Sequence, residues 1–119
     1  MTLNQLITQL QHQPGDFKTV IDTIDQHYDF TPTAFRNGDT HNAAGQNNGS
    51  CKLFAFAKHQ QLDEQTTLNA FGAYYTQDVL AHPQGDDHQN IRNFMRYGWA
   101  GIEFEGDALT PKHSTTENN

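Results

Sequence analysis

The segment from Asn37 to Lys52 contains the side chains best suited to chemistry in this chain. It reads NGDTHNAAGQNNGSCK, with four Asn, three Gly, His41 and Cys51, the only cysteine. It has no large apolar side chain, so we expect a loop that leads into a helix. Cys51 with His41 or His88 could form a thiolate–imidazolium pair, because the start of a helix lowers a thiol pKa. The favoured alternative is a buried, structural cysteine.

A second cluster of candidate ligands lies between His82 and His88. It offers the imidazoles of His82 and His88 and the carboxylates of Asp86 and Asp87, which are donors suited to Zn²⁺ or another transition metal. The spacing matches no established metal motif. The favoured alternative is that Asp86 or Asp87 caps a following helix and that His82 lies at the end of the preceding one. The sequence therefore assigns no metal or other cofactor.

Arg92 and Arg96 are one helical turn apart, so both can face the same side of a helix. Two guanidinium groups could bind a carboxylate or a phosphate. In an acidic chain, the favoured alternative is that they pair with Asp or Glu side chains. Tyr74, Tyr75 and Asp78 could contribute hydroxyl and carboxylate groups to the same pocket, although Tyr75 is expected in the core.

Composition and charge narrow the classes of partner. The chain has 119 residues, typical of one domain, and a formal net charge of −7 from 7 basic and 14 acidic residues. It has no basic stripe for phosphates, so nucleic acid and anionic membrane surfaces are disfavoured. With one cysteine there is no internal disulfide, and no apolar run approaches the ~20 residues of a membrane span. We therefore expect a cytoplasmic protein.

The run Gly45–Ser50 lacks the lysine of a phosphate-binding loop, which disfavours nucleotide binding.

Apolar spacing predicts about five helices and two strands. Each helix has an apolar stripe at helical period or a capping residue at its start, and each strand alternates. The predicted helices cover about residues 3–12, 16–28, 50–58, 63–79 and 86–97, and the predicted strands cover 33–37 and 99–105. Ser50, Asp63 and one of Asp86 and Asp87 are the expected N-caps. For residues 53–57 a strand is the competing interpretation.

These elements predict a mainly helical α+β fold with a small antiparallel sheet, in which Thr33–Asn37 pairs with Gly101–Glu105. Residues 1–111 are expected to form a single domain, and residues 112–119 a disordered polar tail. The Asn/Gly segment and His82–Asn93 are both polar and both flank helix starts, so we expect them to lie together and form one polar pocket. The candidate binding residues are Asn37, His41, Asn47, Cys51, Asp87, His88, Asn90 and Arg92.

Three segments resemble a known protein family. They are Phe35–Lys52, then Thr67–Pro83 with its Phe71-Gly72 and Tyr74-Tyr75 pairs, then Gly85–Trp99. On these segments the chain is similar to the HopJ type III effector proteins, and the likeness covers most of residues 28–109. It implies a compact domain of mixed helices and strands with no established activity. It also implies delivery into a host cell by a type III secretion system, to which a resident cytoplasmic role is the alternative.

Two functional hypotheses follow from these observations. The first is a non-enzymatic binding module or effector that docks on a partner protein, which the family resemblance and the lack of a recognised catalytic signature favour. The second is a small hydrolase or a metal-dependent enzyme that uses the polar Asn/His/Asp/Arg pocket. The sequence identifies neither the substrate nor the partner, and it leaves open whether the protein is an enzyme.

Overall fold

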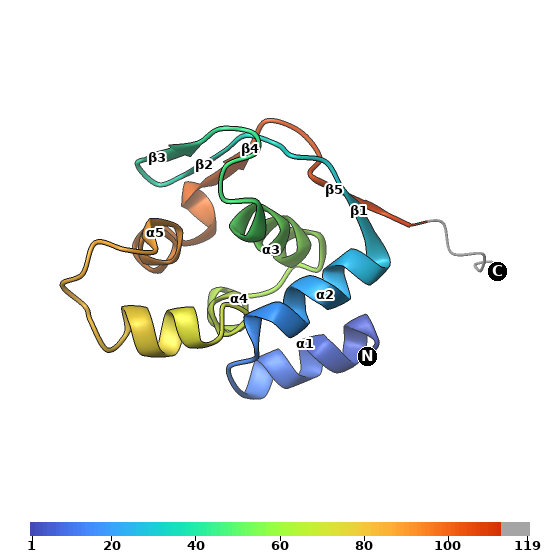
Figure 1. Ribbon diagram of the computed structural model, residues 1–119, viewed down its shortest axis with the longest axis horizontal. Helices are drawn as coiled ribbons and strands as arrows, with labels where there is room; N and C mark the ends of the chain where they lie inside the picture. Colours follow the sequence, from blue (N-terminus) through green and yellow to red (C-terminus); the bar gives the residue numbers. More distant parts are fainter. Residues whose placement is uncertain (113–119) are drawn as a thin grey trace.

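The computed structural model describes residues 1–112 and has the expected α+β fold, with a small amount of antiparallel sheet along one edge of the helices (Figure 1). The helices are α1 (Leu3–His12), α2 (Phe17–His27), α3 (Asn48–His59), α4 (Glu64–Asn69), the π-helix η1 (Tyr74–Val79), α5 (Gln89–Tyr97) and the 3₁₀ turn η2 (Gly98–Gly101). The strands are β1 (Tyr28–Phe30), β2 (Phe35–Asn37), β3 (Thr40–Asn42), β4 (Ile102–Phe104) and β5 (Leu109–Pro111).

The main sheet has three antiparallel strands in the order β3-β2-β4. The predicted pairing of the two strands is confirmed, because Phe35 faces Phe104 and Asn37 faces Ile102 across β2 and β4. Strand β3 was not predicted. It follows β2 after the two-residue turn Gly38-Asp39, a length typical of β-hairpins. A separate pair, β1 with β5, joins the end of α2 to the last described strand.

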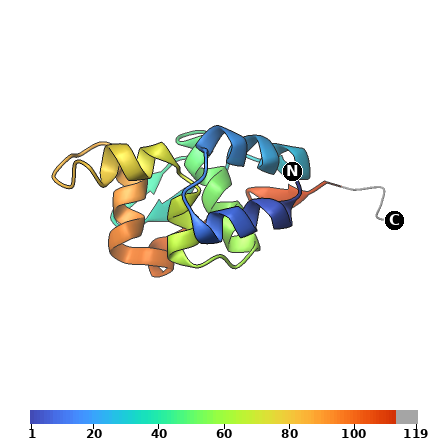
Figure 2. The same cartoon turned by 90° about the horizontal axis from the view of Figure 1, so that it is seen from below.

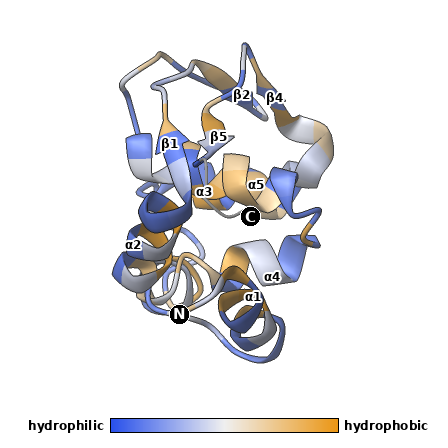
Figure 3. Cartoon of the chain, turned by 90° about the vertical axis from the view of Figure 1, so that its right-hand side faces the viewer, coloured by the Kyte–Doolittle hydropathy of each residue, from blue (hydrophilic) through white to orange (hydrophobic). Residues whose placement is uncertain are grey.

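Helix α3 lies at the centre of the described fold, with the main sheet on one side and α1 and α2 on the other (Figures 1 and 3). Leu53, Phe54, Phe56 and Ala57 on this helix are all fully buried. A helix that is covered on several sides has no single apolar stripe, which explains why residues 53–57 could also be interpreted as a strand. The ring of Phe54 contacts the rings of Phe35, Phe71, Phe94 and Trp99.

Helices α1 and α2 pack side by side below the core, as the view from below also shows (Figure 2). Thr2 and Gln5 form a capping box at the start of α1, which satisfies two backbone donors that would otherwise lack partners. Asp16 accepts a hydrogen bond from Thr19 N at the start of α2, as its position in the sequence predicts. Within the part of the chain that the structure describes, no helix is long and apolar enough to cross a membrane.

Two predicted helix starts are wrong in their details. Helix α3 begins at Asn48, with Asn47 rather than Ser50 at the N-cap position. Helix α5 begins at Gln89, with His88 rather than Asp86 or Asp87 at the N-cap position. Both N-cap residues have the left-handed conformation, with φ of 51° and 49°. The chain therefore enters each helix through a tight turn, which a simple search for capping side chains does not detect.

The predicted helix over residues 63–79 is divided into two elements. The expected cap is correct, since Thr66 N donates a 2.7 Å hydrogen bond to Asp63 Oδ1. The helix then stops at Asn69, because Gly72 has a φ of +61° and reverses the chain before the π-helix Tyr74–Val79 begins. Residues 70–73 thus redirect the chain so that η1 projects beside the loop that leads to α5.

The ends of other elements differ by a few residues from the prediction. The predicted strand over 99–105 is shorter, because η2 occupies Gly98–Gly101 before β4. The predicted tail of 112–119 begins with Lys112, whose backbone N donates a hydrogen bond to His27 O. The rest of that prediction, 113–119, lies outside the described residues. The described residues share one hydrophobic core.

The turn at Gly72 gives a first test of this packing. A Cβ added there would lie 2.6 Å from Gly15 O and 3.1 Å from Phe17 N, and an L-residue is strained at this φ. We expect Gly72→Ala to lower the free energy of unfolding by about 2 kcal/mol or more in urea denaturation. Gly45→Ala is the control, since Gly45 has a φ of +91° but no described atom within 4 Å of the added Cβ, and it should cost about 1 kcal/mol. Equal losses would contradict this account.

Candidate functional site

A polar pocket lies where the starts of α3 and α5 meet. Its volume is about 370 Å³, which is within the usual range for small-ligand sites. The Asn/Gly segment and the start of α5 meet here through Asn42 and Asn90, which are 48 residues apart in sequence. The lining residues are Thr40, Asn47, Gly49, Ser50, Phe71, Tyr74, His88, Gln89, Asn90 and Ile91.

Three buried asparagines form a hydrogen-bonded network behind the pocket. Asn37, Asn42 and Asn90 are 0%, 1% and 7% exposed. Asn90 Oδ1 accepts hydrogen bonds from Asn37 Nδ2 (3.0 Å) and Asn42 Nδ2 (3.1 Å), while Asn90 Nδ2 donates to Asn42 Oδ1 (3.0 Å). Asn47 Nδ2 donates a 2.7 Å bond to Asn42 Oδ1. The network therefore ties the β2–β3 hairpin and the loop before α3 to the first turn of α5.

Two further bonds fasten the hairpin to α5. Asn93 Nδ2 donates to Asn37 O (3.1 Å) and to Thr40 Oγ1 (2.8 Å). The one buried side-chain oxygen or nitrogen without a partner among the described residues is Asn37 Oδ1.

Asn37 and Asn90 were expected to bind a ligand directly, but the structure uses most of their polar atoms within the protein. Sequence analysis did not select Asn42, the centre of this network, although it belongs to the same Asn-rich segment.

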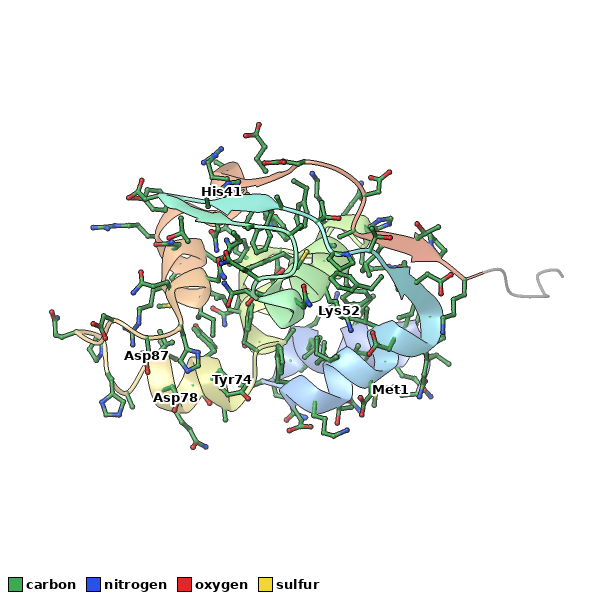
Figure 4. The ribbon with its side chains drawn as sticks, turned by 45° about the horizontal axis from the view of Figure 1, so that its top comes forward. Met1, His41, Lys52, Tyr74, Asp78 and Asp87 are labelled. Atoms are coloured by element: carbon green, nitrogen blue, oxygen red, sulfur yellow. The ribbon has the colours of Figure 1, made fainter. Side chains whose placement is uncertain are left out.

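His88 supplies the imidazole that lines the pocket. Its Nε2 lies 3.0 Å from Asp78 Oδ2, and its ring centroid lies 5.2 Å from that of Tyr74. Tyr74 and Asp78 lie one turn apart on η1, with Asp87 in the loop beyond them (Figure 4). A carboxylate oxygen only accepts hydrogen bonds, so Nε2 is the donor when Asp78 is a carboxylate.

The two helix starts add a weak positive potential to the pocket. The first backbone N–H groups of any helix have no intrahelical acceptor, and in the described structure neither Asn47 before α3 nor His88 before α5 caps them with its side chain. Gly49 and Ser50 from α3 and Gln89 and Asn90 from α5 line the pocket. Helix N-termini favour acceptors and negative charge. The pocket thus combines backbone donors, amide and hydroxyl groups and one imidazole.

Asp87 and Arg92 lie together but point away from this pocket. Arg92 Nη2 donates a 2.7 Å bond to Asp87 Oδ1, Nε donates to Asp87 O, and Nη1 donates to His82 O. The hydrogen bond from Arg92 lowers the pKa of the Asp87 carboxyl below its usual value. The two side chains hold the loop before α5 in place. The expected pairing of the two arginines with acidic side chains thus holds for Arg92, whereas Arg96 has no such ion pair within residues 1–112.

The remaining sequence-predicted residues are dispersed. His41 is exposed in the middle of β3, opposite Arg36, and Figure 4 shows it on the hairpin, apart from Tyr74 and Asp78. His82 and Asp86 are exposed in the loop before α5. Among residues 1–112, no three or more His, Cys, Asp or Glu side chains are grouped so that they could hold a metal ion.

Cys51 is a buried core residue. It is 1% exposed, and its thiol donates a 3.4 Å hydrogen bond to Thr33 O. Burial raises the pKa of the Cys51 thiol, because removal from water disfavours the thiolate. This direction is opposite to the one expected from its position near the start of α3. The structure thus supports the structural alternative for this cysteine.

The comparison with protein families identifies the group to which this fold and pocket belong. The family model described as "HopJ type III effector protein" matches residues 3–109. The chain belongs to the HopJ family. The match extends beyond the segments that carry the resemblance in the sequence, because it also includes α1 and α2.

A solved structure supports the HopJ fold of the chain. The crystal structure of VPA0580, described as a protein of unknown function, has 53% sequence identity to this chain and a TM-score of 0.91. The alignment covers 94% of this chain and 95% of that one. No curated protein matches this chain. The HopJ assignment therefore gives the fold without an activity.

The asparagine network gives a test of how the pocket is held in this HopJ protein. Asn90→Ala removes the side chain that links Asn37 with Asn42 and leaves buried polar groups with fewer partners. We expect it to lower the free energy of unfolding by about 2–4 kcal/mol, because buried polar groups without partners are costly. The control is Asn48→Ala, at an exposed position, which should change it by less than about 0.5 kcal/mol. If the two variants lose similar amounts of unfolding free energy in urea denaturation, the network contributes no more to stability than an exposed asparagine does.

Proposed function

We propose that this HopJ-family protein is a non-enzymatic binding module that docks on a partner protein through the polar pocket. The observation that carries the proposal is the position of His88, which Asp78 holds at 3.0 Å beside Tyr74 on the wall of the pocket. An imidazole held in one orientation, next to a half-exposed aromatic ring, is suited to recognise a polar group of a partner.

The framework behind the pocket supports this proposal. The Asn37–Asn42–Asn90 network and the Asn93 bonds hold both walls together, so that little ordering remains to be done when a partner binds. Tyr74 is 44% exposed, and Tyr is among the residues that contribute most to protein interfaces. Ser50 and Gln89 offer a hydroxyl and an amide within the same wall. This set of groups favours directional hydrogen bonding to a partner.

A small hydrolase is the second candidate, because one observation favours it specifically. An imidazole oriented by a carboxylate is the base of many hydrolases, and Ser50 lines the same pocket as His88. Both residues lie within the described part of the chain, and no hydrogen bond joins the Ser50 hydroxyl to the His88 imidazole. The contact that a hydrolase would need is therefore not formed in this structure. The candidate metal ligands Asp87 and His88 are already paired with Arg92 and Asp78, which weakens the metal-dependent version.

The HopJ assignment also supports a proposal about delivery. The family description is that of a type III effector, so we propose that a type III secretion system delivers the protein into a host cell. A translocation reporter fused to the full chain should reach host cells from a strain with the secretion system and should stay in the bacterium without it. Equal signals from the two strains would leave a resident bacterial role instead.

His88 and His41 form a matched pair of variants for the proposed function. Affinity capture from bacterial and host extracts would identify a partner, and its Kd would then be measured with purified proteins. We expect His88→Ala to raise this Kd about tenfold or more, since it removes a held polar contact worth about 1.4 kcal/mol. His41→Ala, on the outer face of the hairpin, should leave the Kd unchanged.

His88→Ala, together with Asp78→Asn, also distinguishes a hydrolase from a non-enzymatic binding module. A panel of ester, phosphoester and peptide substrates would be assayed with the wild type, His88→Ala and Asp78→Asn. Turnover that falls at least a hundredfold in His88→Ala would establish the hydrolase and reject the non-enzymatic proposal. A partner whose Kd is unaffected by His88→Ala would place recognition outside the polar pocket.

A further inference from the structure

We propose that a groove on the outer side of α5 is a second contact surface of the binding module, and that it takes a partner segment with an apolar side chain next to a carboxylate. This inference rests on the proposed protein-binding function and names the chemistry of the partner. We call this hollow the α5 groove. It has a volume of about 430 Å³ and is bounded by Val79 and Leu80, Pro83, and Arg92, Met95 and Arg96 of α5.

The apolar part of the α5 groove is the first argument. Leu80 and Met95 are 47% and 44% exposed, whereas Val79, the last residue of η1, is 2% exposed. Among the described residues, only four large hydrophobic side chains are at least 44% exposed, and two of them line this one groove. Burial of such surface drives association, and a methionine adapts its shape to different partners. The groove therefore favours an apolar side chain of the partner.

The far wall of the α5 groove is held in place before any partner binds. Arg92 donates three hydrogen bonds, to Asp87 O (2.6 Å), His82 O (2.9 Å) and Asp87 Oδ1 (2.7 Å). These bonds attach the loop 82–87 to α5, so Arg92 is a positioning residue and its charge is already paired. A rigid wall lowers the entropy lost on binding, which suits a groove that receives an extended segment.

The charge at the α5 groove comes from Arg96. Within the described part of the chain, no carboxylate lies within 4.0 Å of its guanidinium, which is 5.8 Å from the ring centroid of Tyr97. A guanidinium binds a carboxylate with two parallel hydrogen bonds. The chain as a whole is acidic, at −7, but distant charges are screened beyond about 8 Å at physiological salt. At contact range Arg96 dominates, and it favours an acidic side chain beside the apolar one.

The occupant is thus a protein segment and not a nucleic acid or a membrane. Phosphate backbones require several cations along a track, whereas this groove has one guanidinium whose charge is not paired and a large apolar component. Gln89 lines both the α5 groove and the polar pocket. A segment in the α5 groove can therefore continue toward the polar pocket across the first turn of α5.

The test uses a phage-displayed library of random 12-residue peptides selected on the full-length protein. The variants are Arg96→Glu and Leu80→Asp in the α5 groove. Lys18→Glu is the control, because it makes the same charge change on α2, where the Lys18 side chain is 82% exposed. All three positions are exposed, and thermal unfolding checks that each variant folds.

We expect the wild type and Lys18→Glu to enrich peptides in which Leu, Ile, Met or Phe lies within three residues of Asp or Glu. A synthetic peptide of that sequence should bind Arg96→Glu and Leu80→Asp at least tenfold more weakly than the wild type. Failure to enrich any peptide, or enrichment of peptides whose Kd is unchanged in Arg96→Glu, would overturn the inference.

Two further outcomes separate this inference from the proposed function. Peptides whose binding is lost in His88→Ala but kept in Arg96→Glu would overturn the α5 groove and leave the polar pocket as the recognition site. If sedimentation of the wild type reveals concentration-dependent dimers that Leu80→Asp abolishes, the occupant is a second copy of this chain, and the inference fails. Loss of peptide binding in Arg96→Glu with no effect of His88→Ala would instead support the groove and reject the polar pocket.

Discussion

The hydrogen bonds among Asn37, Asn42 and Asn90 fix how three separate elements of the structure meet. They connect a short hairpin, a glycine-rich loop and the first turn of α5. In a buried setting, each carboxamide must find partners, because an unpaired amide costs about 1–3 kcal/mol. The same requirement that makes the network costly to disturb gives the polar pocket a defined shape.

The network depends in turn on the apolar centre of the molecule. Phe54 on α3 contacts rings from β2, the turn after α4, α5 and η2, so one aromatic side chain links the sheet to the helices around it. A small acidic domain with few aliphatic residues gains much of its buried area from such rings. The hairpin and α5 are therefore positioned by packing first, and the carboxamides then fix their relative orientation.

The loop between η1 and α5 separates two kinds of surface. On one side, His88, Tyr74 and two helix starts form the polar pocket. On the other, Leu80, Met95 and Arg96 border the α5 groove. Arg92 ties the loop to α5 through three hydrogen bonds, so a partner would meet two preformed hollows on either side of the first turn of one helix. This arrangement fits the proposed recognition of a partner by shape and hydrogen bonding.

Local patterns in the sequence predicted several elements correctly, and the reasons are physical. The apolar spacing of Leu6 and Leu10 and of Val20 and Ile24 indicated α1 and α2, because those side chains face the core at helical period. Asp63 was identified as a cap because its carboxylate accepts the bond from Thr66 N. The pairing of β2 with β4 followed from alternation at both segments. The Asn/Gly loop and the start of α5 were expected to meet, and they do.

Tertiary structure alone decided which polar side chains face which way. His41 and Asn42 are adjacent, yet the alternation of β3 sends one to the surface and the other into the interior, and that strand exists only because it pairs with β2. Cys51 near a helix start could have had a reactive thiol, but it is buried in the core, and this burial raises the pKa of the Cys51 thiol. The sequence by itself determined the elements whose signals are local. The partners of Asn90, His88 and Arg92 depend on segments far apart in the chain, and only packing brings those segments within hydrogen-bonding distance.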